Sequence, residues 1–258
     1  KILQYDIVGF SCFKSNFPST VSFITELKER RKDVIVVLGG PEITRQFFKT
    51  RGKFDEQILS LADFLVVGEG EYPLYRIVDN KYRKKVSAFE QLNDLKEISF
   101  PYYRGLELNN YPRKDTLPIQ VSRGCIRKCS FCSERLLYRG FRLRPLENVI
   151  EEISYHHFNN RTNCFVFFDS LINADLIYLD NLCDRIIENF GSIPWEAQIA
   201  IRNDMDIGLF EKIKRSGCYN LFVGLESGSD RTLRRMRKGF TTKDAREFFE
   251  KLNKAGLS

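Results

Sequence analysis

Short apolar runs recur along this chain, and each is followed by glycines or polar residues and then by a stretch with helical spacing. Residues 7–10, 34–38 and 64–67 are three such runs, and a helix with Thr20 as its N-cap is predicted after the first. Strands that are apolar throughout and separated by helices form a parallel sheet covered on both faces. Residues 1–95 are therefore predicted to form an α/β domain with a partial doubly wound parallel sheet.

The same alternation resumes in residues 115–258, after a polar stretch with Pro and Tyr at 96–114 that is predicted to be a linker. Strands are predicted at 117–122, 164–168, 195–201 and 219–225. Helices are predicted at 147–158, 174–189, 209–215, 231–237 and 243–254. About four βα units predict part of a βα barrel. The chain is expected to begin within the first domain and to end within the barrel.

Composition places few limits on the partners of this chain. Its 258 residues carry a net charge of +7, partly from basic runs at 81–85 and 231–238. These runs do not form a continuous stripe, so binding to nucleic acid is not predicted. Neither a signal peptide nor an apolar run long enough to span a bilayer is recognisable, and a cytoplasmic protein is expected.

Three of the seven cysteines, Cys125, Cys129 and Cys132, lie within eight residues directly after a predicted strand. An odd number of cysteines with this crowding favours a metal site in a reducing compartment over disulfides. Three thiolates at this spacing can bind three irons of a 4Fe-4S cluster and leave the fourth iron open. A structural zinc site needs a further Cys or His pair nearby. The alternatives that remain are a zinc-stabilised binding module and an iron–sulfur electron carrier without enzymatic activity.

The motif Cys-x-x-x-Cys-x-aromatic-Cys at the end of a first barrel strand resembles that of the radical S-adenosylmethionine (SAM) superfamily, over residues 116–258. The resemblance implies that SAM chelates the open iron and is cleaved to a 5′-deoxyadenosyl radical. It also implies that Phe131 packs near the adenine of SAM. An electron donor such as flavodoxin or ferredoxin is then expected as a partner.

Further residues at the ends of predicted strands resemble SAM contacts of this superfamily. Glu226, in a Glu-Ser-Gly-Ser segment, would contact the amino or ribose groups, and Arg202 a carboxylate. Asp169 and Ser170 take the place of the family's Gly-Gly-Glu motif, so their assignment departs from the usual pattern.

The first part of the chain resembles the cobalamin-binding domain that precedes some radical SAM barrels, through segments 6–12, 38–42 and 67–71. The resemblance implies that a corrin lies over the carboxyl ends of the strands, where glycines allow close approach. The residues implied are Ser11, Gly39, Gly40, Gly68, Glu69 and Gly70. The Asp-x-His-x-x-Gly segment that usually supplies an axial histidine is not found.

Together these features predict a cobalamin-dependent radical SAM enzyme, either a methyltransferase or an oxidative cyclase, acting on an unreactive C–H position of a small molecule. A radical methylthiotransferase acting on RNA or protein is the enzymatic alternative. That class would need three more cysteines in the amino-terminal domain, where only Cys12 lies.

Overall fold

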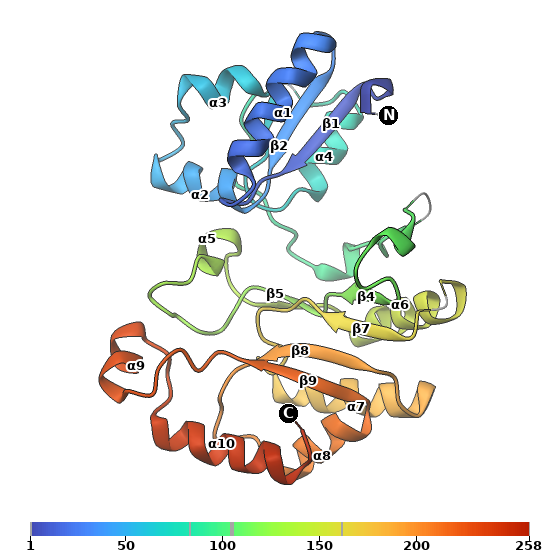
Figure 1. Ribbon diagram of the computed structural model, residues 1–258, viewed down its shortest axis with the longest axis vertical. Helices are drawn as coiled ribbons and strands as arrows, with labels where there is room; N and C mark the ends of the chain where they lie inside the picture. The colour runs from blue at the N-terminus through green and yellow to red at the C-terminus, as the bar shows by residue number, and fades with distance from the viewer. Residues whose placement is uncertain (1, 83, 104–105, 161, 258) are drawn as a thin grey trace. The chain divides into compact units, whose positions relative to one another are not determined.

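A computed structural model describes residues 2–82, 84–103, 106–160 and 162–257 (Figure 1). The chain divides into two compact units. The first comprises Lys1–Asn93 and Ser133–Arg139, and the second comprises Asp94–Cys132 and Gly140–Ser258. No helix within the described ranges is long and apolar enough to cross a membrane.

The first unit is built on a parallel sheet of β1 (Ile7–Ser11), β2 (Ile35–Gly39) and β3 (Phe64–Leu65), in that spatial order. Alternate residues of β2 enter separate hydrophobic clusters, with Val36 and Leu38 in one and Val37 in the other. Successive strand residues point to opposite faces, so both faces of this sheet are buried as predicted.

Helices and bridges complete the first unit. Its helices are the 3-10 helix η1 (Ile2–Gln4), α1 (Phe17–Arg30), α2 (Pro41–Lys49), α3 (Glu56–Leu61), α4 (Glu71–Val78) and the short α5 (Glu134–Leu137). Two isolated parallel bridges, Leu65 to Val86 and Gly68 to Glu90, continue the pairing beyond β3.

The predicted N-cap of the first helix is wrong. The cap is Asn16, and Thr20 lies one turn inside α1, where its hydroxyl donates to the Asn16 carbonyl at 2.9 Å. The helix starts earlier because Pro18 stands in its first turn, where the missing N–H costs no hydrogen bond.

The second unit has a four-stranded parallel sheet in the order β4-β7-β8-β9. The strands are β4 (Thr116–Ile119), β7 (Cys164–Phe167), β8 (Trp195–Ile199) and β9 (Cys218–Val223). The predicted strand at 117–122 is wrong in its extent, since β4 ends at Ile119 and β5 (Ser122–Arg123) pairs instead with the antiparallel β6 (Arg142–Leu143). The helices are η2 (Leu95–Glu97), η3 (Leu108–Asn110), α6 (Leu146–Asn159), α7 (Leu176–Phe190), α8 (Ile207–Arg215), α9 (Asp230–Met236) and α10 (Thr242–Lys254).

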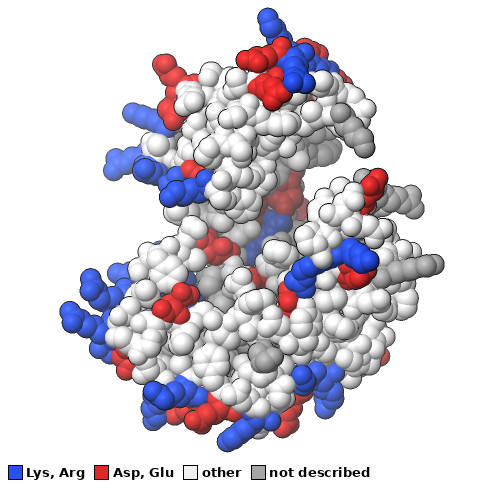
Figure 2. Space-filling view, viewed as in Figure 1, with Lys and Arg blue, Asp and Glu red and all other residues white. Residues whose placement is uncertain are grey.

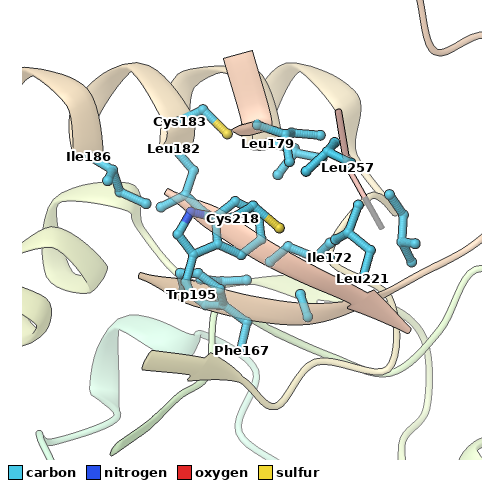
Figure 3. Packing of buried hydrophobic residues seen from close by; sticks show 14 of the residues in the cluster. Phe167, Ile172, Leu179, Leu182, Cys183, Ile186, Trp195, Cys218, Leu221 and Leu257 are labelled. Carbon is cyan, nitrogen blue, oxygen red and sulfur yellow. The ribbon is translucent and has the colours of Figure 1, made fainter. Parts of the chain in front are cut away.

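The core of the second unit lies between one face of this sheet and its helices (Figure 3). Trp195 is fully buried at its centre, with its ring 5.3 Å from that of Phe167 and its indole N–H donating to Ser216. Leu182 and Ile186 of α7 pack over the same cluster. Phe222 of β9 and Phe168, the residue directly after β7, are exposed, so the two faces of the sheet differ in their surroundings.

Candidate functional site

The three clustered cysteines lie in the loop of residues 124–132, which we call the cysteine loop. None of the three forms a disulfide bond within the described residues; Cys125 and Cys129 are half-buried and Cys132 is exposed. The Arg127 amide donates to the Cys125 sulfur at 3.4 Å. Among the described residues, no three His, Cys, Asp or Glu side chains converge as the ligands of a single metal ion do. A 4Fe-4S cluster presents separate irons, and three cysteine thiols in one loop have the donor chemistry that it needs.

The loop is anchored at its start by Asp169, which follows β7. The buried carboxylate accepts hydrogen bonds from the Ser122 amide and hydroxyl, both at 2.5 Å, and from the Val121 amide at 3.2 Å. Burial raises the pKa of Asp169 to about 6, although these hydrogen bonds act in the opposite direction. Asp169 therefore holds the backbone that leads into Cys125, and Ser170 follows it half-buried.

The raised pKa of Asp169 makes a prediction for stability. Between about pH 4 and pH 6 the folded chain keeps a proton on Asp169 that the unfolded chain has lost. Stability from this group is therefore full below about pH 4 and is lost as the pH rises through about 6. Urea unfolding of wild type and Asp169→Asn at several pH values should give a free-energy difference that changes across this window. A difference independent of pH would contradict the prediction.

The far side of the cysteine loop is bound to residues 235–240, around the end of α9. The Ser130 amide donates to the Met236 carbonyl at 2.9 Å. The Arg127 guanidinium donates to the Ile201 carbonyl after β8 at 2.8 Å and to the Gly239 carbonyl at 3.3 Å. Gly239 has a φ of +76°, and a Cβ there would lie 2.5 Å from Nη1 of Arg127. The loop is therefore tied to two other strand-end segments.

Lys238 links two of the predicted SAM residues. Its ammonium lies 3.5 Å from Oε1 of Glu226 and 5.7 Å from the ring centre of Phe131. Glu226 has a φ of +64°, a conformation that is rare for a residue with a side chain. The structure thus brings Phe131 and Glu226 to one cation. Lys238 was not predicted as a site residue, because the sequence distinguishes it only by its position directly before Gly239.

Arg202, after β8, lies on a pocket of about 380 Å³. Its guanidinium pairs with Asp204 at 2.5 Å and donates to the carbonyls of Asn173 and Ala174 at 2.8 Å. This pairing lowers the pKa of Asp204. Residues of the cysteine loop, including Arg127, line the same pocket. The structure therefore places Arg202 beside the loop with its hydrogen bonds directed to its own strand end.

In the first unit, Ser11 and Gly39 are register partners at the ends of β1 and β2. Gly40 follows them, and a Cβ there would lie 2.9 Å from both the Cys12 amide nitrogen and the Ser11 hydroxyl oxygen. A Cβ at Gly68 would lie 2.4 Å from the Glu90 carbonyl oxygen. Both glycines have positive φ, and a Cβ at either position would collide with backbone atoms of the same unit. The fold itself therefore requires glycine at both positions.

The two remaining residues of this edge differ from each other. Glu69 is buried, and its carboxylate accepts a hydrogen bond from the Leu92 amide at 2.7 Å. A Cβ at Gly70 would meet nothing within 4 Å, so Gly70 faces open space. The predicted residues therefore lie at the carboxyl ends of the strands, and there is open space beside Gly70.

Comparison with known families agrees with this arrangement. A model described as the radical SAM superfamily matches residues 119–258, more than half of the chain, and a model described as the B12 binding domain matches residues 2–78. The chain belongs to the radical SAM superfamily. Its class is that of the cobalamin-dependent radical SAM enzymes, whose cofactors are a 4Fe-4S cluster, SAM and cobalamin.

Two curated relatives are named as a methyltransferase and as a cyclase. An uncharacterized methyltransferase of Pyrococcus horikoshii is 26% identical, covering 98% of this chain and 58% of its own length. The anaerobic magnesium-protoporphyrin IX monomethyl ester cyclase of a Synechocystis species is 26% identical over 95% of this chain and 52% of its own length. The chain thus spans about half the length of these curated relatives.

A solved structure of the cobalamin-dependent SAM radical enzyme OxsB, with aqua-cobalamin and SAM bound, superposes with a TM-score of 0.77. It is 17% identical and covers 99% of this chain and 40% of that one. At this identity the match concerns the fold, and the predicted fold class is confirmed.

Proposed function

We propose that this chain is the cofactor-binding part of an enzyme that methylates or oxidatively cyclises an unreactive C–H position of a small molecule. A methyltransferase and a cyclase among its relatives support these two reaction types. The observation that carries the proposal is the cysteine loop, which is bound to the segment that presents Lys238 to Phe131 and Glu226.

In this proposal Cys125, Cys129 and Cys132 ligate the cluster. Bound there, a 4Fe-4S cluster would supply the electron for reductive cleavage of SAM. Asp169 holds Val121 and Ser122, and Arg127 holds the middle of the loop, so the thiols keep their places when irons bind. These two residues position the ligands without touching the reacting atoms.

The SAM site is proposed to lie beside the loop. The exposed ring of Phe131 offers a face for the adenine, with Lys238 on the same ring. Glu226 can accept hydrogen bonds from an amino or ribose group, and its partly exposed carboxylate has Lys238 as neighbour. Arg202 is proposed to attract a carboxylate, and Asp169 and Ser170 to form the wall at the end of β7.

The cobalamin site is proposed at the glycine-rich edge of the first unit, formed by Ser11, Gly39, Gly40, Gly68, Glu69 and Gly70. The open space at Gly70 allows a planar ligand to approach the backbone there. In this proposal residues 1–95 form the cobalamin-binding domain, residues 96–114 a linker and residues 115–258 the radical SAM core. Seven cysteines without a disulfide among the described residues suit a reducing compartment, and a cytoplasmic location is proposed.

The test is anaerobic reconstitution of the chain followed by metal, cofactor and product analysis. We expect about four irons with matching sulfide per chain, a corrinoid absorbance after mixing with hydroxocobalamin, and SAM cleavage with dithionite. Colourless protein with stoichiometric zinc would overturn the proposal. Iron without affinity for hydroxocobalamin would remove cobalamin from it. The methylthiotransferase alternative would need three further cysteines in the amino-terminal domain, where only Cys12 lies.

A further inference from the structure

A cluster of exposed basic side chains lies beside the cysteine loop. We call it the basic patch: Lys128, Arg231, Arg234, Arg235 and Arg237. Four of these residues stand within seven positions on α9 and directly after it, and Lys128 stands inside the cysteine loop. Figure 2 shows basic side chains gathered on the surface over α9. The basic run noted in the sequence at 231–238 therefore forms one surface with the loop.

The acidic neighbour of the patch on α9 is Asp230, whose carboxylate accepts a hydrogen bond from the Thr242 amide. Within the described ranges, no ion pair involves any of its five side chains, whereas Lys212 of the same unit bridges Asp180 and Asp184. Like charges this close repel one another and disfavour the folded state. An external anionic surface would relieve that repulsion.

The patch is attached directly to the loop that carries the thiols. Leu233 is buried on the inner side of α9, whereas the arginines of the patch on this helix are exposed. The last residues of α9 receive hydrogen bonds from Ser130, with the amide on Met236 at 2.9 Å and the hydroxyl on Arg235 at 3.4 Å. Ser130 stands between Cys129 and Cys132, and Cys132 is exposed. A partner seated on the patch would therefore lie next to the cluster ligands.

We infer that the basic patch is the docking surface for an acidic one-electron donor protein of the flavodoxin class. The inference rests on the proposed function, because only a cluster held by the loop needs such a donor. One electron leaves the flavin hydroquinone of the donor, which becomes the semiquinone, and reduces the cluster from the 2+ to the 1+ state. Complementary charge speeds the encounter of the two proteins and orients them.

The composition of the patch favours a protein over a nucleic acid. Arginine is enriched in protein interfaces, where its planar group pairs with carboxylates in two-point contacts. Surfaces for single-stranded nucleic acid combine a basic groove with aromatic side chains that stack on bases. The exposed positions of α9 are basic or polar. The exposed aromatic ring beside them, Phe131 of the cysteine loop, is assigned to SAM in the proposed function and has Lys238 over it.

The test compares two charge-matched double variants of the reconstituted protein. Arg231→Gln/Arg234→Gln removes two charges from the patch. Lys214→Gln/Arg215→Gln removes two exposed charges from the end of α8, next to the start of β9. Stopped-flow reduction by an acidic flavodoxin hydroquinone at low salt should be about tenfold slower in the patch variant alone. The wild-type rate should also fall with salt more steeply than that of the patch variant.

Two readouts separate docking from cluster chemistry. Reduction by dithionite should be equal in all three proteins, and the Kd for oxidised flavodoxin, measured by calorimetry, should rise about tenfold in the patch variant only. Equal flavodoxin rates in all three proteins, or an equal loss in both variants, would overturn the inference. So would a patch variant that loses affinity for a single-stranded RNA oligonucleotide while keeping its rate with flavodoxin. A wild type without iron would instead count against the proposed function, and flavodoxin binding would still be measurable.

Discussion

Replacing Cys129 with alanine is expected to abolish assembly of the 4Fe-4S cluster. The cysteine loop offers three thiols, and two cannot hold three irons of one cluster. Cys183 of α7 and Cys218, the first residue of β9, are buried in the core of the second unit and cannot replace Cys129 (Figure 3). Burial raises the pKa of Cys183 to about 12 and also raises that of Cys218, so neither offers a thiolate. Iron and sulfide analysis and EPR after anaerobic reconstitution would measure the loss.

Cys164→Ala is the matched control. Cys164 is half-buried at the start of β7, and its thiol contacts only the Tyr219 hydroxyl among its polar neighbours in the described chain, at 3.6 Å. This variant should bind iron like the wild type and unfold at a similar urea concentration. Full iron content in Cys129→Ala, or equal iron loss in both variants, would contradict the assignment of the cysteine loop.

Local sequence patterns were enough to predict the main strands and helices of both units. The apolar run at 34–38 became β2 at Ile35–Gly39, and the amphipathic stretch at 243–254 became α10 at Thr242–Lys254. Helix α2 escaped prediction because Gly39, Gly40 and Pro41 signal a turn, although proline also suits the first turn of a helix. The end of the strand at Ile119 was not predicted, because the partner of β5 lies about 20 residues further on, outside any local sequence window.

The site was predictable in its chemistry and less so in its supports. Cysteine spacing identified the loop, since the spacing is a property of the sequence alone. The burial of Asp169 against Ser122 depends on how β4 and β7 pair, which no local pattern records. The contacts of Arg127 with Ile201 and Gly239 likewise join residues about 75 and 110 positions apart. Residues that hold a loop in place are therefore identified only once the strand order is known.

Gly124→Ala is the second change for which a large effect is expected. Gly124 stands directly before Cys125 with a φ of +85°, and a Cβ there would lie 2.1 Å from the Gly140 carbonyl oxygen. The obstacle is backbone, held by the pairing of Ser122 and Arg123 with β6. The alanine must therefore push the start of the cysteine loop away from residues 140–143. We expect a loss of about 3 kcal/mol or more in unfolding free energy and much faster loss of iron to a chelator.

Gly140→Ala separates the effect of the backbone collision from that of the left-handed backbone conformation. Gly140 has a nearly equal φ of +81°, but a Cβ there would meet nothing within 4 Å. This variant bears only the cost of a left-handed alanine, about 1–2 kcal/mol, and should keep its iron. Urea unfolding and iron-release rates of the two variants, side by side, would measure the difference. If they lose equal stability, backbone conformation alone explains the glycines. If Gly124→Ala loses more, the close approach of two backbones is what fixes the first cluster ligand.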